Sequence, residues 1–99
     1  MTKEKINEMP YAVFAYVHHN RKVASLITIR CKTDFALRTD LLKDFGHKVA
    51  MHASAFGGVE LGADWILDNK LSVKKAIAEV SSQLGEPVII DKVSIQGLT

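Results

Sequence analysis

The four histidines and the single cysteine are the side chains of this 99-residue chain best suited to bind a metal or to act in catalysis. His18 and His19 are adjacent in a stretch typical of a strand, so we expect their side chains to point to opposite faces and not to share a metal. His47 and His52 are five residues apart in an expected helix, where a spacing of four would align them. Cys31 has no second cysteine with which to form a metal site or an intrachain disulfide. We therefore expect neither a metal nor a cofactor.

Motifs of covalent and phosphate chemistry are also missing from the sequence. The pair Gly57-Gly58 is followed by Val59 and lacks the lysine of a phosphate-binding loop. No serine lies in the Gly-x-Ser-x-Gly elbow of a hydrolase. Asp64 and Asp68 are four residues apart, a spacing that a solvated helical face explains as well as catalysis does. The sequence predicts a protein that is not an enzyme.

The sequence Thr33-Asp34-Phe35 places a large aromatic residue directly after a polar, turn-forming pair. It lies between an expected strand and an expected helix. Most phenylalanine side chains fold into their own core, and the residues alone favour that interpretation for Phe35. The alternative is an exposed aromatic wedge on a turn that Asp34 stabilises.

Two strands are expected to position these residues. Residues 11–18 and 23–31 are rich in β-branched and aromatic side chains, and they predict a hairpin with a two-residue turn at Asn20 and Arg21. Its pairing places on one face Ala12, Phe14, Tyr16, Val23, Ile27 and Ile29, and on the other Val13, Ala15, Val17, Ala24 and Leu26. Both faces are apolar. Because a helix layer covers only one of them, we expect the second to be covered in a homodimer.

A helix is predicted over residues 41–56, with Thr39 or Asp40 as its N-cap and Gly57-Gly58 at its end. Apolar residues recur in it at spacings of three, four and four: Leu42, Phe45, Val49 and Ala53. Gly46 is a weak point inside this helix, since glycine costs about 1 kcal/mol relative to alanine.

The rest of the chain predicts a second helix and a third strand. The helix covers residues 72–84 with Ser72 as its N-cap, Gly85 ends it, and residues 88–95 form the strand. Residues 57–70 are expected to form a connector. The order strand, strand, helix, helix, strand predicts an α+β fold, with a three-stranded antiparallel sheet packed against helices.

Composition agrees with one globular domain, expected over residues 11–99 after a flexible tail at residues 1–10. Hydrophobic residues make up 47% and charged residues 24% of the chain, and the net charge is +2. This charge is too balanced for a chain that mainly binds nucleic acid. A basic cluster on the hairpin keeps RNA binding open as an alternative: Arg21, Lys22, Arg30 and Lys32. No stretch of the sequence has the length of a membrane span or the pattern of a signal peptide, so we expect a cytoplasmic protein.

Residues 18–35, HHNRKVASLITIRCKTDF, resemble the signature of bacterial elongation factor Ts, in which a His-His-Asn-Gly turn leads to a strand that ends in Asn-Cys-Glu-Thr-Asp-Phe. Residues 45–51 are similar to the helix that follows in that family. Residues 71–95 look like its terminal helix, Leu-Gly-Glu-Asn corner and last strand. The resemblance covers residues 11–97 and implies one core subdomain, without the family's N-terminal ubiquitin-associated-like domain.

The resemblance implies a guanine nucleotide exchange factor for the translational GTPase elongation factor Tu. It implies that Phe35 is a wedge between helices of the GTPase, which displaces the groups that hold Mg²⁺ and the nucleotide. Asp34 would orient the loop and contact the partner. The implied binding residues are Thr33, Asp34, Phe35, His47, Met51 and His52. Short members of the family dimerise sheet on sheet, which agrees with the second apolar face.

Three basic residues replace family residues near the motif: Arg21, Arg30 and Lys32. They are expected to place three positive charges beside the wedge. The alternative function is an adaptor or sequestering protein that binds elongation factor Tu without exchanging its nucleotide.

Overall fold

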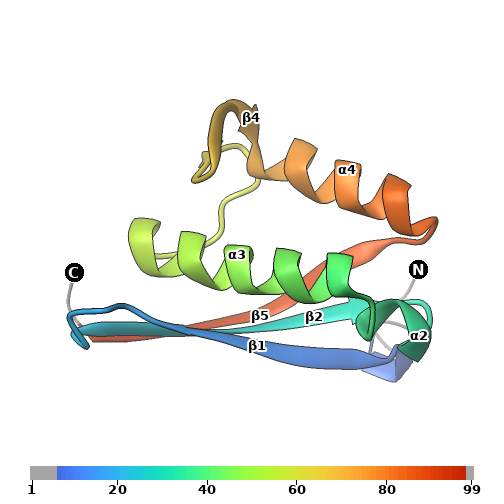
Figure 1. Ribbon diagram of the computed structural model, residues 1–99, viewed down its shortest axis with the longest axis horizontal. Helices are drawn as coiled ribbons and strands as arrows, with labels where there is room; N and C mark the ends of the chain where they lie inside the picture. The colour runs from blue at the N-terminus through green and yellow to red at the C-terminus, as the bar shows by residue number, and fades with distance from the viewer. Residues whose placement is uncertain (1–6, 98–99) are drawn as a thin grey trace.

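A three-stranded antiparallel sheet forms one layer of the structure, a computed structural model that describes residues 7–97. Its strands are β1 (Tyr11–Val17), β2 (Val23–Cys31) and β5 (Val88–Gly97), with β2 in the centre. Figure 1 shows helix α3 (Asp40–Phe56) on one face of the sheet and helix α4 (Val73–Leu84) farther out on the same side. The α+β fold with this antiparallel sheet is therefore as predicted.

The β1–β2 hairpin has the predicted register. Tyr11 lies opposite Arg30 and Val17 opposite Ala24, which centres the hairpin on Asn20 and Arg21. Side chains alternate between more and less buried along both strands, and those that face α3 are the more buried. The other face, which we call the open sheet face, carries the exposed side chains of Tyr11, Val13, Ala15, Val17 and Leu26.

The tip of the hairpin differs from the prediction. β1 ends at Val17, so His18 and His19 lie beyond the strand and their rings are 4.2 Å apart, between centroids. The expectation that the two rings point to opposite faces is therefore wrong, because strand alternation does not extend to them. Arg21 takes the left-handed conformation, with φ of 62°, and the backbone N–H of Lys22 donates to Asn20 Oδ1 at 2.9 Å.

Helix α3 has the predicted cap and buried stripe. Thr39 Oγ1 accepts a hydrogen bond from the N–H of Leu42, and Gly57 ends the helix with a φ of 74°. The predicted apolar stripe is buried: Leu42, Phe45, Val49 and Ala53. Gly46 lies against the Phe14 ring of β1, since a Cβ added to it would be 2.4 Å from Phe14 Cγ. Its missing side chain lets α3 approach the sheet.

Helix α4 and its exit also follow the prediction. Ser72 is the N-cap, and its side chain accepts from the N–H of Lys75. Gly85 ends the helix with a φ of 77°. The chain then enters β5, which pairs with β2 and has a register shift opposite Thr28 and Ile29.

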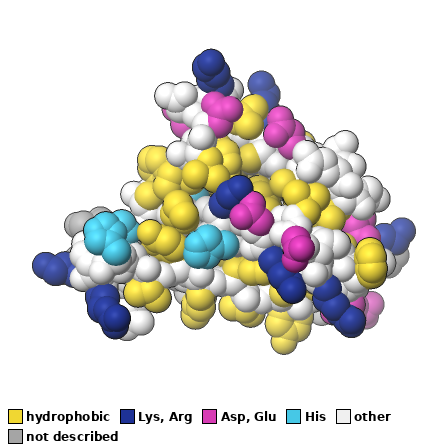
Figure 2. All heavy atoms as spheres, viewed as in Figure 1, with side chains coloured by type: hydrophobic (Ala, Val, Ile, Leu, Met, Phe, Trp, Pro, Cys, Tyr) yellow, Lys and Arg dark blue, Asp and Glu magenta, His cyan; other side chains and the backbone are white. Residues whose placement is uncertain are grey.

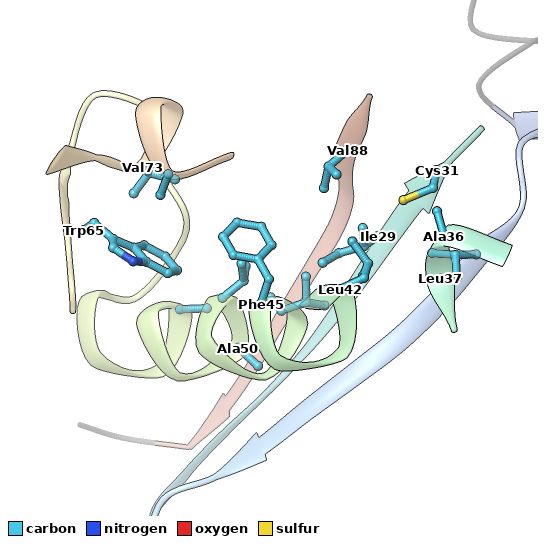
Figure 3. Packing of buried hydrophobic residues seen from close by; sticks show 14 residues of the cluster. Ile29, Cys31, Ala36, Leu37, Leu42, Phe45, Ala50, Trp65, Val73 and Val88 are labelled. Atoms are coloured by element: carbon cyan, nitrogen blue, oxygen red, sulfur yellow. The ribbon is translucent and has the colours of Figure 1, made fainter. Parts of the chain in front are cut away.

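Three elements of the described residues were not predicted. A short helix, α2 (Asp34–Leu37), follows β2, and the expected connector contains a hairpin of β3 (Asp64–Trp65) and β4 (Asp68–Ser72). This hairpin brings Trp65 into the core (Figure 3). The Trp65 ring stacks on His52 at 5.1 Å and lies 5.7 Å from Phe45, between centroids.

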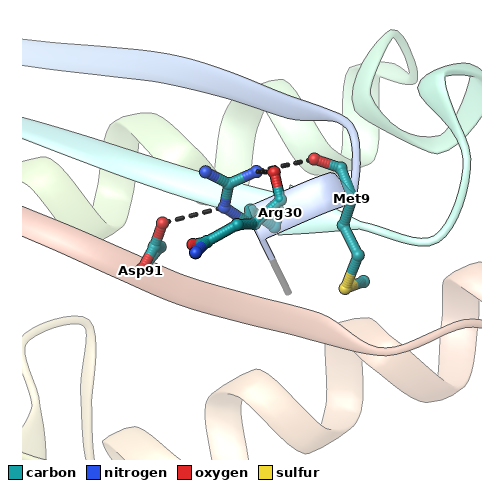
Figure 4. A network of polar contacts seen from close by, with 4 residues as sticks. Met9, Arg30 and Asp91 are labelled. Carbon is teal, nitrogen blue, oxygen red and sulfur yellow. Dashed lines mark hydrogen bonds and ion pairs between the residues drawn. The ribbon is translucent and has the colours of Figure 1, made fainter. Parts of the chain in front are cut away.

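The expected flexible tail lies partly outside the described residues. Of its last part, Met9 is buried, and its carbonyl oxygen accepts from Arg30 Nη1 at 2.7 Å. Arg30 Nε also donates to Asp91 at 2.8 Å, so its guanidinium links this segment to β5 (Figure 4). Within residues 7–97, no helix is long and apolar enough to cross a membrane.

Candidate functional site

The turn formed by α2 presents the aromatic residue of the Thr-Asp-Phe motif to solvent. Thr33 is the N-cap, and its Oγ1 accepts from the N–H of Ala36 at 3.2 Å. Ala36 and Leu37 are buried and attach the turn to the core, as Figure 3 shows. Phe35 points away and is 79% exposed. The interpretation that Phe35 folds into its own core is therefore wrong, because α2 places Ala36 and Leu37 inward in its stead.

Asp34 lies in the first turn of α2 and forms an ion pair with Arg38, four residues later. A carboxylate at this position is favourable for a helix N-terminus. Both side chains are more than half exposed, and pairs of this kind contribute at most about 1 kcal/mol. The ion pair alone does not hold a four-residue helix in place.

A carboxylate from the other end of the chain contacts the same turn. Glu86 Oε1 accepts from the backbone N–H of Thr33 at 2.8 Å, and Glu86 Oε2 accepts from Thr33 Oγ1 at 2.9 Å. Sequence reasoning missed this residue, because the two partners are 53 positions apart. Its signal in the sequence was the Leu-Gly-Glu corner after the second predicted helix.

Cys31 lies just before this turn and is fully buried. Burial and the nearby Glu86 carboxylate raise the pKa of the Cys31 thiol to about 11. The thiol is thus protonated at neutral pH, the form that neither attacks electrophiles nor binds metals well. Within residues 7–97, no three histidine, cysteine or acidic side chains gather as metal ligands would.

The three predicted site residues on α3 have different positions. His47 is exposed and meets the Tyr16 ring edge-on, with centroids 5.6 Å apart, and Met51 is half-buried. His52 is 0% exposed, so its prediction as a direct partner contact is wrong. It lies on the core side of the helix, where its Nδ1 accepts from the N–H of Ile66 at 3.2 Å.

A cavity of about 340 Å³ lies between the hairpin tip and the second half of α3. Its lining includes Tyr16, His18 and Met51. Figure 2 shows histidine side chains beside hydrophobic ones on this part of the surface. The α2 turn lies at the start of α3 in Figure 1, so the site has two parts, the turn and the outer face of α3.

The expected basic cluster beside the turn is not formed. Arg21 lies at the hairpin tip, at the opposite end of β2 from Thr33. The Arg30 guanidinium is bound to Asp91 and to the Met9 carbonyl. Of the three basic residues expected there, Lys32 alone is an exposed side chain next to the turn.

Fold and site together define a small α+β domain that presents an exposed aromatic side chain on a capped turn. No protein-family model matches the chain. It is 35% identical to elongation factor Ts of a Nostoc species over 78 residues, 77% of this chain and 25% of that protein. It is 29% identical to elongation factor Ts of Rubrobacter xylanophilus over 84 residues, 84% of this chain and 43% of that protein.

A shorter match, to elongation factor Ts of Fervidobacterium nodosum, is 49% identical over 43 residues, which are 43% of this chain and 22% of that protein. The chain belongs to the elongation factor Ts family in the region that these matches cover. It spans less than half the length of these curated relatives.

Proposed function

We propose that this chain binds the translational GTPase elongation factor Tu and promotes release of GDP by inserting Phe35 as a wedge. The observation that carries the proposal is that Phe35 is exposed on a turn whose next two residues, Ala36 and Leu37, are buried in the core. The relatives, all elongation factors Ts, support this choice of partner. Burying one phenylalanine supplies about 2–3 kcal/mol, enough to anchor an interface.

The proposed mechanism needs no bond-making residue. Mg²⁺ requires near-octahedral coordination at short distances, so a wedge that shifts its ligands in the GTPase weakens the binding of Mg²⁺ and GDP. By linkage, GDP must weaken the binding of this chain by the same factor. Exchange is then a competition between two conformations of the GTPase.

Roles of the other site residues follow from their positions. Thr33 caps α2, and Asp34 lies beside Phe35 with its carboxylate accessible to a partner. His47 and Met51 extend the contact along the outer face of α3. His52 would act only indirectly, by supporting the helix from the core.

Release of a fluorescent GDP analogue from bacterial elongation factor Tu tests the proposal. Added chain is expected to accelerate release in a saturable way, and Phe35→Ala to abolish the acceleration. Phe56→Ala is the matched control, because Phe56 is also an exposed aromatic residue, at the far end of α3. Unchanged release with Phe35→Ala would contradict the wedge. Co-elution of the two proteins without acceleration would indicate an adaptor that binds without exchange.

We also propose that a second copy of the chain covers the open sheet face. Tyr11, Val13 and Val17 of β1 are each more than half exposed there, and so is Leu26 of the central strand. Apolar side chains exposed side by side on a flat sheet favour association. A two-fold axis would pair this surface with itself.

A further inference from the structure

The junction between β2 and α2 lies beside the corner that joins α4 to β5. The last backbone pair of the two strands is Cys31 with Val88. Thr33 lies two residues after Cys31 and Glu86 two residues before Val88, so the antiparallel register places them opposite each other. The backbone ladder does not continue to this point, and the Glu86 carboxylate accepts from the Thr33 N–H in its place.

The corner that carries Glu86 is held rigidly. Gly85 has a φ of 77° as the C-cap of α4, and the ring of Pro87 fixes its own φ. The N–H of Val88 donates to Ser81 Oγ at 3.2 Å, which ties the start of β5 back to the helix. The Glu86 carboxylate is therefore offered to Thr33 from a fixed position.

Thr33 in turn connects this carboxylate to the exposed phenylalanine. Its Oγ1 donates to Glu86 Oε2 and accepts from the N–H of Ala36. One hydroxyl thus links the fixed corner to the first turn of α2. Phe35 lies between Thr33, which is bound to Glu86, and Ala36, whose N–H is bound to Thr33. The direction of its ring therefore depends on how this turn is held.

We infer that Glu86 is a positioning residue for the Phe35 wedge: it clamps Thr33 by two hydrogen bonds and so orders α2 before the partner arrives. This inference rests on the proposed function. Ordering in advance removes from the binding step the cost of fixing the turn. Without the clamp, the free energy of ordering the turn reduces the binding affinity, while the Phe35 side chain itself is unchanged.

The clamp is tested first in the isolated chain, by amide hydrogen exchange. Replacing Glu86 by alanine is expected to speed exchange of the Thr33 N–H about tenfold, as the loss of one hydrogen bond to a charged group implies. Glu86→Gln keeps one acceptor oxygen and is expected to retain part of the protection. Glu79→Ala removes an equal charge from the exposed side of α4 and should leave exchange unchanged. An unchanged Thr33 N–H in Glu86→Ala would overturn the inference.

The release of fluorescent GDP then tests the functional part. With Glu86→Ala, the chain concentration for half-maximal acceleration is expected to rise about fivefold, while the maximal rate is kept. Phe35→Ala instead removes the maximal acceleration. If Glu86 acts through Phe35, its replacement changes the affinity of a Phe35→Ala chain for the GTPase by less than about twofold. A half-maximal concentration equal to that of the unmodified chain would overturn the inference.

The two proposals fail in different ways. If the unmodified chain does not accelerate release, the proposed function fails, and exchange of the Thr33 N–H alone then decides whether Glu86 holds the turn. If release is accelerated and depends on Phe35 but not on Glu86, the clamp is wrong and the wedge stands. Circular dichroism of each variant confirms that it is folded, and Glu86→Gln serves where alanine prevents folding.

Discussion

The effect of Gly46 on stability depends on Phe14, a residue far from it in the sequence. By helix propensity alone, glycine at this position destabilises α3, because alanine is favoured over glycine in a helix by about 1 kcal/mol. In the folded chain the Phe14 ring occupies the space where a side chain would be, with 2.4 Å between Phe14 Cγ and an added Cβ. The two effects have opposite signs, and the steric one is the larger, since overpacking a core costs about 1–3 kcal/mol.

We therefore expect Gly46→Ala to lower the free energy of unfolding by about 2 kcal/mol. Urea denaturation measures the change. Lys43→Ala, on the exposed side of the same helix, should change it by less than about 0.5 kcal/mol. Phe14→Leu combined with Gly46→Ala should recover part of the loss, because the smaller side chain makes room. A stabilised Gly46→Ala variant would contradict the contact.

His52 couples stability to pH. Burial between Trp65 and Phe56 lowers the pKa of His52 from its ordinary value of 6.5. The unfolded chain takes up this proton as the pH falls through 6.5, whereas the folded chain takes it up only at lower pH. The unfolded state therefore binds more protons in this range, and stability falls as the pH is lowered.

The expected slope from this one group is up to about 1.4 kcal/mol per pH unit below pH 6.5. Urea denaturation at several pH values between 5 and 8 measures it. His52→Gln, whose side-chain oxygen can still accept from the N–H of Ile66, should flatten the slope. His19→Gln, at the exposed hairpin tip, should keep it. An equal slope in His52→Gln would mean that another group causes the acid sensitivity.

At the scale of elements, the sequence predicted what local signals determine. The cap and buried stripe of α3, from Thr39 to Ala53, lie within a few turns of each other, and so do Ser72 and Gly85 around α4. The β3–β4 hairpin was missed because β3 has two residues and β4 is mostly exposed, so neither shows an alternating pattern. Its stability comes from Trp65 packing on α3, a tertiary contact.

In the candidate site, too, local sequence signals were found and tertiary contacts were missed. The motif around Phe35 was visible in the sequence, but its residues alone favoured a buried ring, and α2 reversed that expectation. Glu86 was not found because its partner Thr33 is brought near only when β5 pairs with β2. His52 was given as a binding residue by the family resemblance, although its spacing of three from Val49 and seven from Phe45 places it on the predicted buried stripe.

The β1–β2 hairpin gives a prediction about its turn. Arg21 has a φ of 62°, a conformation that costs a non-glycine residue about 1 kcal/mol. Arg21→Gly is expected to raise the free energy of unfolding by about 0.5–1 kcal/mol, the relief of strain being partly offset by the greater freedom of glycine in the unfolded chain. Thermal and urea denaturation measure it. Lys22→Gly, at a position without positive φ, should give no gain, and equal effects of the two changes would refute the argument.

On the scale of the whole molecule, the two faces of the sheet have different surroundings. On the face covered by α3, Ile27 and Ile29 are fully buried, whereas the open sheet face leaves Val13 55% and Leu26 52% exposed. Leu26 lies on β2, the central strand with β1 and β5 on either side, and its side chain is exposed even so. A second copy facing it would bury the two hairpins against each other. In Figure 1, α3 lies on the opposite side of the sheet and the α2 turn lies at its end.

We therefore expect the chain to sediment at twice its own mass at micromolar concentrations, and Leu26→Glu to reduce it to a monomer. Two like charges would face each other near the two-fold axis in the dimer, whereas in the monomer the glutamate would be solvated and the fold kept. Leu67→Glu is the matched control, since Leu67 is 49% exposed but lies in the β3–β4 hairpin. Because Leu26 lies in the middle of β2 and α2 begins only after the end of that strand, the monomeric variant should still present Phe35. Its acceleration of GDP release per chain then tells whether the exchange site is complete within one copy. A monomeric unmodified chain at high micromolar concentration would show that the open sheet face has another role.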